Sequence, residues 1–259
     1  MNVQLKAQIK QNLETSLQKF FRDKEVKHSH LLDLLFPNER RIRSLVGGLE
    51  TSLGVVICKP IAQVLAKANG FLVEDKDLLM PNPFPEILSQ EVEQLKQSWQ
   101  NNTLITTEEY VNRLKESALK SDRENLNYVN PAAKKTVDLY LFKDGKEYAF
   151  DLKSVQINKR SGIDFKLQLI DWYSYRFCQD PAANFTAKIV FPVNPYKVDW
   201  WKRQGERAYP LEKGKDAWVQ DEFWDFCSGR TDTWAEIIEI LDELGKEGFG
   251  EQFKEIFYR

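Results

Sequence analysis

Histidine and cysteine are scarce in this chain. Its 259 residues include two histidines, His28 and His30, and three cysteines, Cys58, Cys178 and Cys227. No two cysteines are close in sequence, which argues against a disulfide framework or a CxxC zinc site. Two histidines offer few candidates for Ser-His-Asp catalysis or for a histidine-rich metal site. Both are therefore expected to be surface or packing residues.

Long apolar runs are also absent. No segment approaches the ~20 apolar residues that span a bilayer, and the mean hydropathy is −0.51. The segment 1–21 lacks the apolar centre of a signal peptide. We therefore expect a soluble, cytoplasmic protein without a membrane partner. A chain that is 42% hydrophobic can bury a large core, which fits one large domain.

Charge is nearly balanced overall but unevenly distributed. The formal net charge of −2 argues mildly against a nucleic-acid binder. Residues 134–215, however, carry 16 Lys or Arg against 10 Asp or Glu, a net of +6, whereas residues 216–259 carry 4 against 12, a net of −8. This asymmetry indicates a polyanion-binding surface on the middle segment. An ordinary fluctuation of surface charge is the alternative, and charge alone does not decide between them.

The hydrophobic pattern changes along the chain from helical to strand periodicity. Helices are predicted at 3–22, 39–68 with a bend, 89–120, 164–178 with Asp164 as the cap, 217–227, 232–245 and 248–258. Strands are predicted at 136–142, 147–153 and 185–193, followed by a long loop at 194–215. This order predicts an α/β fold in which a mixed central sheet is flanked by helices on both sides.

The two adjacent strands carry the most informative pattern. Asp144-Gly145 is the favoured two-residue hairpin turn, so opposite residues have numbers that sum to 289. Asp138 then faces Asp151, and Lys153 lies on the same face as Asp151, one step along the strand. The opposite face is apolar and must enter the core, which fixes the register.

Two opposed carboxylates repel each other, and a divalent cation relieves the repulsion. Mg²⁺ prefers oxygen ligands and keeps several waters, so Asp138, Asp151 and the backbone carbonyl of Leu152 suit it. Lys153 would help to deprotonate or orient a metal-bound water, and metal and ammonium together would stabilise charge on a phosphate. The alternative is a solvated strand face with an Asp–Lys pair, because D…DxK alone is a weak signal.

The pattern Asp138…Asp151-Leu152-Lys153 resembles the PD-(D/E)xK nuclease motif, with Val137 where the motif often has Pro. More of residues 40–180 is similar to the TdeIII/MjaII-type type II restriction endonucleases; the segments are RSLVGGLETSLG (43–54), AKANGF (66–71), TVDLYLF (136–142) and DLKSVQINKRSGIDFKLQLIDWYSYRF (151–177). The resemblance implies a PD-(D/E)xK restriction-endonuclease-like core that cleaves double-stranded DNA at a short near-palindromic site of the GGNCC class. It also implies Mg²⁺, with Mn²⁺ as a substitute.

Glu50 is a further catalytic candidate, because in nucleases of this motif a helical Glu often completes the metal site. It falls in the apolar stripe of Val46, Leu53 and Ile57, where an unpaired carboxylate is costly. The alternative is a Glu at the edge of the stripe that reaches solvent.

Candidate DNA contacts lie after the hairpin and in the long loop. Polar and basic residues that would bind DNA are Asn158, Lys159, Arg160, Lys166, Arg203 and Arg207. The first three follow Lys153 in a loop, and Lys166 begins the next helix. Arg203 and Arg207 are four apart and would share one face of a short helix. A solvated basic loop is the alternative for the 158–160 segment.

We therefore expect a single nuclease domain over 1–259, with a helical part at about 1–130, the hairpin core at about 131–195, and a DNA-recognition loop with C-terminal helices at about 196–259. A symmetric site implies a homodimer in which each subunit cuts one strand. Two alternatives stay open: a structure-specific repair or recombination nuclease with the same core, and a catalytically inactive DNA-binding module.

Overall fold

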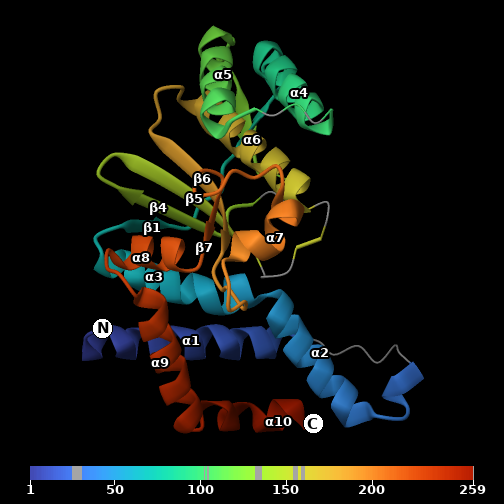
Figure 1. Cartoon of the computed structure of the whole chain (residues 1–259), viewed down its shortest axis with the longest axis vertical. Coiled ribbons are helices and arrows are strands. Elements are labelled where there is room, and N and C mark those ends of the chain that lie inside the picture. Colours follow the sequence, from blue (N-terminus) through green and yellow to red (C-terminus); the bar gives the residue numbers. More distant parts are fainter. Residues whose placement is uncertain are drawn as a thin grey trace. The chain divides into compact units, whose positions relative to one another are not determined.

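The computed structural model describes residues 1–24, 31–101, 103, 105–131, 136–153, 157–158 and 161–258 (Figure 1). They form two compact units. One comprises residues 1–69 and 224–259, and the other comprises residues 70–223. Whether the two work as one nuclease domain stays a prediction.

A mixed five-stranded sheet lies at the centre of the 70–223 unit. In spatial order its strands are β1 (Leu72–Glu74), β4 (Leu139–Lys143), β5 (Lys146–Leu152), β6 (Phe185–Phe191) and β7 (Ala217–Val219). The β1–β4 and β4–β5 pairs are antiparallel, whereas β5–β6 and β6–β7 are parallel. The predicted α/β class with a mixed sheet is thus confirmed. The strands of this sheet that periodicity missed, β1 and β7, are three residues long.

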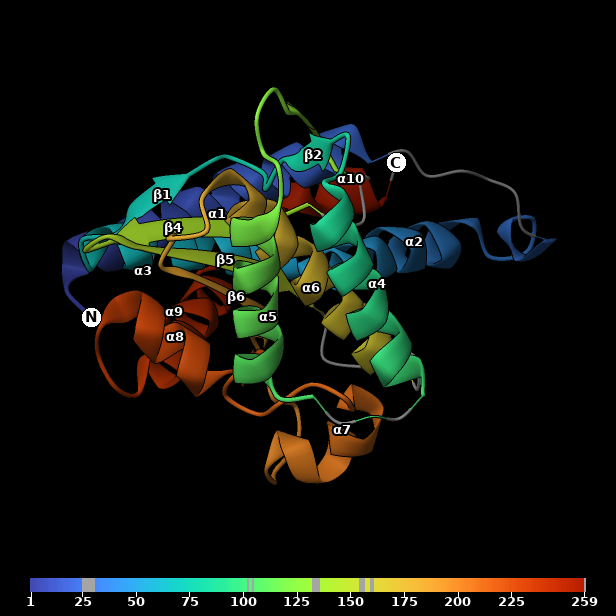
Figure 2. The same cartoon turned by 90° about the horizontal axis from the view of Figure 1, so that it is seen from above.

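Helices of the same unit cover one face of the sheet. They are α4 (Glu86–Gln100), α5 (Thr107–Lys120), α6 (Ser161–Gln179) and α7 (Trp200–Ala208), and a second small sheet pairs β2 (Met80–Asn82) with β3 (Asn127–Val129). The α6 helix packs against β6, and α4 and α5 pack side by side on α6 (Figure 2). The predicted helix 89–120 is two helices, because Thr106 caps the second by accepting the Glu109 N–H at 3.2 Å.

Aromatic residues of α6 fill the core beneath this layer. Trp172, Tyr173, Tyr175 and Phe177 are all buried. Both faces of the hairpin are buried, because consecutive residues of β4 and β5, which point to opposite faces of the sheet, are inaccessible to solvent. These residues are Leu139, Tyr140, Leu141, Ala149, Phe150 and Asp151. The hairpin is therefore the middle of the sheet, and Asp151 enters the interior with the apolar residues.

The other unit is helical. Its elements are α1 (Val3–Asp23), α2 (Pro37–Thr51), a π-helical turn (Gly54–Cys58), α3 (Lys59–Ala68), most of α8 (Asp221–Ser228), α9 (Thr233–Lys246), a 3₁₀ turn (Phe249–Phe253) and α10 (Lys254–Phe257). The predicted bend within residues 39–68 is confirmed, since the axis turns by 66° between α2 and the 54–68 segment. The predicted helix 217–227 begins at Asp221, because β7 occupies its first three residues.

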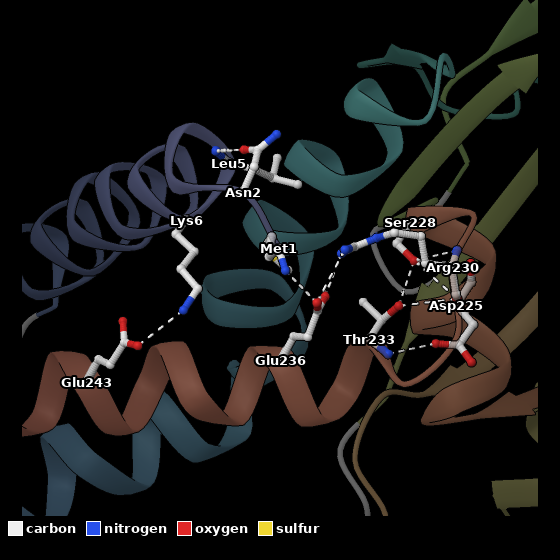
Figure 3. Close-up of polar contacts among 10 residues, drawn as sticks. All are labelled: Met1, Asn2, Leu5, Lys6, Asp225, Ser228, Arg230, Thr233, Glu236 and Glu243. Atoms are coloured by element: carbon white, nitrogen blue, oxygen red, sulfur yellow. Dashed lines mark hydrogen bonds and ion pairs between the residues drawn. The ribbon is translucent and has the colours of Figure 1, made fainter.

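Ion pairs connect α1 to α9 within this unit (Figure 3). Lys6 Nζ lies 3.2 Å from Glu243 Oε1, and the amino group of Met1 lies 2.5 Å from Glu236 Oε1, which also pairs with Arg230. Such pairs add little individually, so buried apolar residues of both helices, Ile9 and Ile237 among them, supply most of the stability.

Among the described residues, no single helix is long and apolar enough to cross a membrane. The bent pair Pro37–Thr51 with Gly54–Ala68 passes the same test of length and composition.

Candidate active site

The hairpin turn sets the geometry of the candidate site. Asp144 and Gly145 both have positive φ, 51° and 74°, as a type I′ turn requires. The predicted register is confirmed, since Lys143 pairs with Lys146, Phe142 with Glu147, and Leu139 with Phe150. Asp138 and Asp151 follow next at the open end of the hairpin.

Backbone hydrogen bonds hold Asp138 beside β5. Its N–H donates to the carbonyl of Phe150 at 3.0 Å, and its Oδ2 accepts the N–H of Leu152 at 2.8 Å. Asp151, 2% exposed, lies in β5 between these two partners. Lys153 places Nζ 2.8 Å from Asp151 Oδ1, and its N–H donates to Val190 of β6. The structure thus brings the three predicted residues together.

The electrostatics of the pair favour a cation. Burial, with a further contribution from the carboxylate of Asp138, raises the pKa of Asp151 to about 7, even though Lys153 opposes the shift. Its negative charge is therefore costly at neutral pH. A positive ion between the two carboxylates would stabilise both ionised forms.

Gln168 is a site residue that the sequence analysis did not assign to the carboxylates. Its Nε2 donates to Asp151 Oδ2 at 2.9 Å from the second turn of α6, and its side chain is buried. Asp151 therefore has one oxygen held by Lys153 and the other by Gln168. In the sequence Gln168 is one of several polar residues in α6, so no pattern singled it out.

The donor set fits Mg²⁺, although the described residues hold no cluster of three or more Asp, Glu, His or Cys side chains around a common point. Mg²⁺ is commonly bound by one or two carboxylates with several waters. Asp138, Asp151 and the carbonyl of Leu152 would supply oxygen ligands from one end of the hairpin. The negative charge of Asp138, which adds to the effect of burial on the pKa of Asp151, is one that a bound cation would neutralise.

An open pocket of about 460 Å³ adjoins Lys153 and Gln168. Phe165, Lys96 of α4 and Asp171 of α6 also line it. Lys96 Nζ lies 2.8 Å from the buried Asp171 and keeps part of its side chain exposed. A phosphate approaching Lys153 through this pocket would meet a second ammonium group, which sequence reasoning missed because α4 is distant in sequence.

The predicted DNA contacts after the hairpin have different outcomes. Asn158 is exposed, and its Oδ1 accepts the N–H of Ser161 at 3.1 Å at the beginning of α6. Lys159 and Arg160 lie outside the described residues. Asp164 does not cap this helix, because α6 already begins at Ser161. A DNA contact by Asn158 stays a prediction.

Lys166 corrects the sequence analysis, because it is not on the surface. It is 1% exposed, and its Nζ lies 2.5 Å from Oδ2 of Asp216, which is fully buried. Thr107 and Tyr110 also donate to Asp216. A lysine enclosed in this network has no surface from which to contact a phosphate. Its role is structural.

Arg203 and Arg207 are exposed on the short helix α7, as their spacing predicted. The opposite face of α7 buries Trp200, Gln204 and Ala208. Both arginines are accessible to a ligand, and the guanidinium carbon of Arg203 lies 5.8 Å from the ring centroid of Tyr196. Base readout by them stays a prediction.

Glu50 lies near the end of α2, in the unit that does not contain the hairpin. Its side chain is exposed, so the expectation of a carboxylate inside an apolar stripe is wrong. Val46 in the same stripe is exposed as well. The stripe does not face the core at this end of α2, which is the alternative left open by the sequence. A catalytic role for Glu50 stays a prediction.

Comparison with known proteins identifies the class. The family model described as type II restriction endonuclease HinfI matches residues 1–245. The chain therefore belongs to the HinfI family of type II restriction endonucleases. It is also 24% identical over 215 residues to the type II restriction enzyme MjaII of Methanocaldococcus jannaschii, a match that covers 80% of this chain and 55% of that enzyme. The resemblance inferred from the motifs is thus confirmed. No solved structure matches the chain.

Proposed function

We propose that this protein is a Mg²⁺-dependent endonuclease that hydrolyses phosphodiester bonds of double-stranded DNA at a short near-palindromic site. The observation that carries the proposal is the convergence of Asp138, Asp151 and Lys153 at the open end of a central hairpin. Membership of the HinfI family supports it. The chain spans about 55% of the length of its relative MjaII, so activity, substrate and partners are inferences for this chain.

Each residue has a defined task in this reaction. Asp138, Asp151 and the Leu152 carbonyl would hold Mg²⁺, which when bound lowers the pKa of a coordinated water and neutralises charge on the phosphate. Lys153 orients the attacking water and stabilises the extra charge on the phosphate in the transition state. Gln168 fixes the orientation of Asp151. This is the PD-(D/E)xK pattern.

DNA binding is assigned to polar and basic residues that follow the hairpin in sequence. Arg203 and Arg207 on α7 are candidates for base-edge contacts, and Asn158 with Lys159 and Arg160 for phosphates. A near-palindromic site repeats its half-site about a two-fold axis, so we propose a homodimer with one active site per strand.

Digestion of a plasmid of known sequence tests this function. In Mg²⁺, and in Mn²⁺ as a substitute, the wild-type protein should give discrete fragments, while the Asp151→Asn variant gives none. Sequencing the fragment ends identifies the site and decides whether it belongs to the GGNCC class. Cleavage confined to branched or damaged DNA would support a structure-specific nuclease, and binding without cleavage would support an inactive DNA-binding module.

A further inference from the structure

A row of aromatic rings connects Lys153 to α7. Lys153 Nζ lies 5.8 Å from the ring centroid of Phe165 in α6. The Phe165 ring lies 6.1 Å from that of Phe191, the last residue of β6, and Phe191 stacks on Trp200 at 4.3 Å. Trp200 is the first residue of α7. A shift of α7 would therefore reach Lys153 through packed side chains.

A second contact joins α7 to the first turn of α6. A methyl group added at Gly162 would overlap the backbone carbonyl oxygens of Ala208 and Tyr209, at the end of α7. Gly162 does not have a positive φ, so this position requires a glycine for space and not for backbone conformation. Any larger residue must push the two helices apart.

The α6 helix also connects α7 to Asp151, the buried carboxylate of the site. Gln168, which donates to Asp151, lies six residues after Gly162, about 9 Å along the helix axis. One rigid helix thus touches α7 at its first turn and the buried carboxylate in its second. The position of α7 is linked to Lys153 by the rings and to Asp151 by α6.

The buried face of α7 contains polar atoms whose hydrogen bonds are incomplete. Within the described residues, Trp200 Nε1, Trp201 Nε1 and Gln204 Oε1 are buried and have no hydrogen-bond partner. Buried polar groups are nearly always paired, and an unpaired one is destabilising. All three atoms belong to the nine-residue helix α7, so hydrogen bonds of these side-chain atoms do not hold the helix in place.

We propose that α7 controls cleavage, so that Gly162 and Phe165 are positioning residues that determine sequence specificity. Contact of the exposed arginine face with the correct base pairs would fix α7. The Gly162 contact and the Phe165–Phe191–Trp200 row then place Asp151 and Lys153 for catalysis. Incorrect base pairs leave α7 unfixed and the site misaligned. This inference rests on the proposed endonuclease function.

The Gly162→Ala variant tests the coupling, and Gly205→Ala is its matched control. Gly205 lies in α7 itself, and an added methyl group there meets nothing within 4 Å. The wild-type cleavage site is first mapped on a plasmid of known sequence. Short duplexes with this site, or with one base pair changed, then serve as substrates for kcat/KM in Mg²⁺ and for Kd in Ca²⁺.

In Gly162→Ala the ratio of kcat/KM between the mapped and the altered duplex should fall by about five- to 150-fold, the range typical of coupling between two sites. The Kd in Ca²⁺ should change far less, and Gly205→Ala should behave like the wild type. An equal loss of rate on both duplexes would mean a purely structural role and overturn the inference, as would the same loss of ratio in Gly205→Ala.

Phe165→Leu provides a second variant that does not depend on the crowded backbone contact. If circular dichroism shows that Gly162→Ala is unfolded, Phe165→Leu is judged by the same ratio and against the same control. A wild type that cleaves no site overturns the proposed function and this inference with it. Site-specific cleavage by the wild type with an unchanged ratio in the variants overturns only the coupling.

Discussion

Asp151 is nearly inaccessible, and its ionised form makes the metal-free protein less stable. Its pKa is raised from an ordinary 3.8 to about 7, first by burial and then by Asp138. The folded protein therefore keeps a proton that the unfolded chain has lost between about pH 4 and 7. Because the folded pKa is the higher one, this contribution to stability is fully present below pH 4 and is lost as pH rises through 7.

The Asp151→Asn variant removes this charge but keeps the shape of the side chain. A shift of about three pKa units corresponds to about 4 kcal/mol at pH 8. Asp151 is buried, so solvent screening reduces this value little. Lys153, whose side chain is 34% exposed, stays hydrated when its partner becomes neutral. The variant should thus unfold roughly 10 °C above the wild type in EDTA at pH 8.

Thermal unfolding of both proteins in EDTA across pH 4 to 8 measures this effect. Only the difference between them is used, because carboxylates distant from Asp151 titrate equally in both proteins. That difference should fall below about 1 kcal/mol near pH 4, where the wild-type carboxyl is protonated in the folded protein. Mg²⁺ at pH 8 should stabilise the wild type more than the variant.

The same variant should lose cleavage in Mg²⁺ and keep DNA binding in Ca²⁺, because it removes a metal ligand and lowers repulsion toward phosphate. If Asp151→Asn is less stable than the wild type at pH 8 without metal, the carboxylate is not destabilising, and the electrostatic basis of the metal site is wrong. Full cleavage activity in the variant would refute the assignment of Asp151 as a ligand.

Three further predictions concern the rest of the molecule. Asp216→Asn leaves the Lys166 ammonium buried without its counter-charge, so urea unfolding should show a loss of about 3–5 kcal/mol, and a loss below 1 kcal/mol would contradict the buried pair. Arg203→Ala and Arg207→Ala should each weaken DNA binding and, where the arginine contacts a phosphate, lower the salt slope by about one; unchanged affinity would remove that arginine from the interface. Sedimentation should show a homodimer, and a monomer that cuts both strands while bound to its site would exclude the symmetric arrangement.

The hairpin was predictable because its geometry is local. A two-residue turn with Asp144 and Gly145 at positive φ fixes the register as far as the Leu139–Phe150 pair. Asp138 directly precedes β4 and interacts with Asp151. The periodicity of long helices was equally informative, as α1 and α6 show. Three-residue strands such as β7 have too few residues for a period, and their pairing depends on a neighbour distant in sequence.

The errors arise where a side chain is paired with a distant element. Lys166 was assigned to DNA because the sequence does not show that Asp216 lies beside it. Lys188 is also buried and bonded to the carbonyls of Gly214 and Lys215, and burial lowers its pKa to about 8. Two of the basic residues behind the net +6 of residues 134–215 therefore do not reach the surface. Two acidic residues of that segment, Asp151 and Asp171, are buried as well, so a count of charges along the sequence does not say which of them face solvent.

Gln168 offers a test of how the site is held together, because it contacts only one of the two carboxylates. In Gln168→Leu, Asp151 Oδ2 loses its donor, while Asp138 keeps the Leu152 N–H and Lys153 keeps Asp151 Oδ1. Loss of a group that orients a metal ligand typically costs 10–100-fold in metal affinity or activity. The Mg²⁺ concentration for half-maximal cleavage should therefore rise by about 10- to 100-fold at saturating DNA.

The Kd for DNA in Ca²⁺ and the maximal rate at high Mg²⁺ should change much less in this variant, since Lys153 and the α7 arginines are untouched. Gln168→Glu is the informative companion, because a third carboxylate would add a ligand for Mg²⁺ while repelling Asp151 more strongly in its absence. It should need less Mg²⁺ than Gln168→Leu and be less stable than the wild type in EDTA at pH 8. A Mg²⁺ requirement in Gln168→Leu equal to that of the wild type would show that the buried hydrogen bond does not orient Asp151, and that the hairpin alone places the metal ligands.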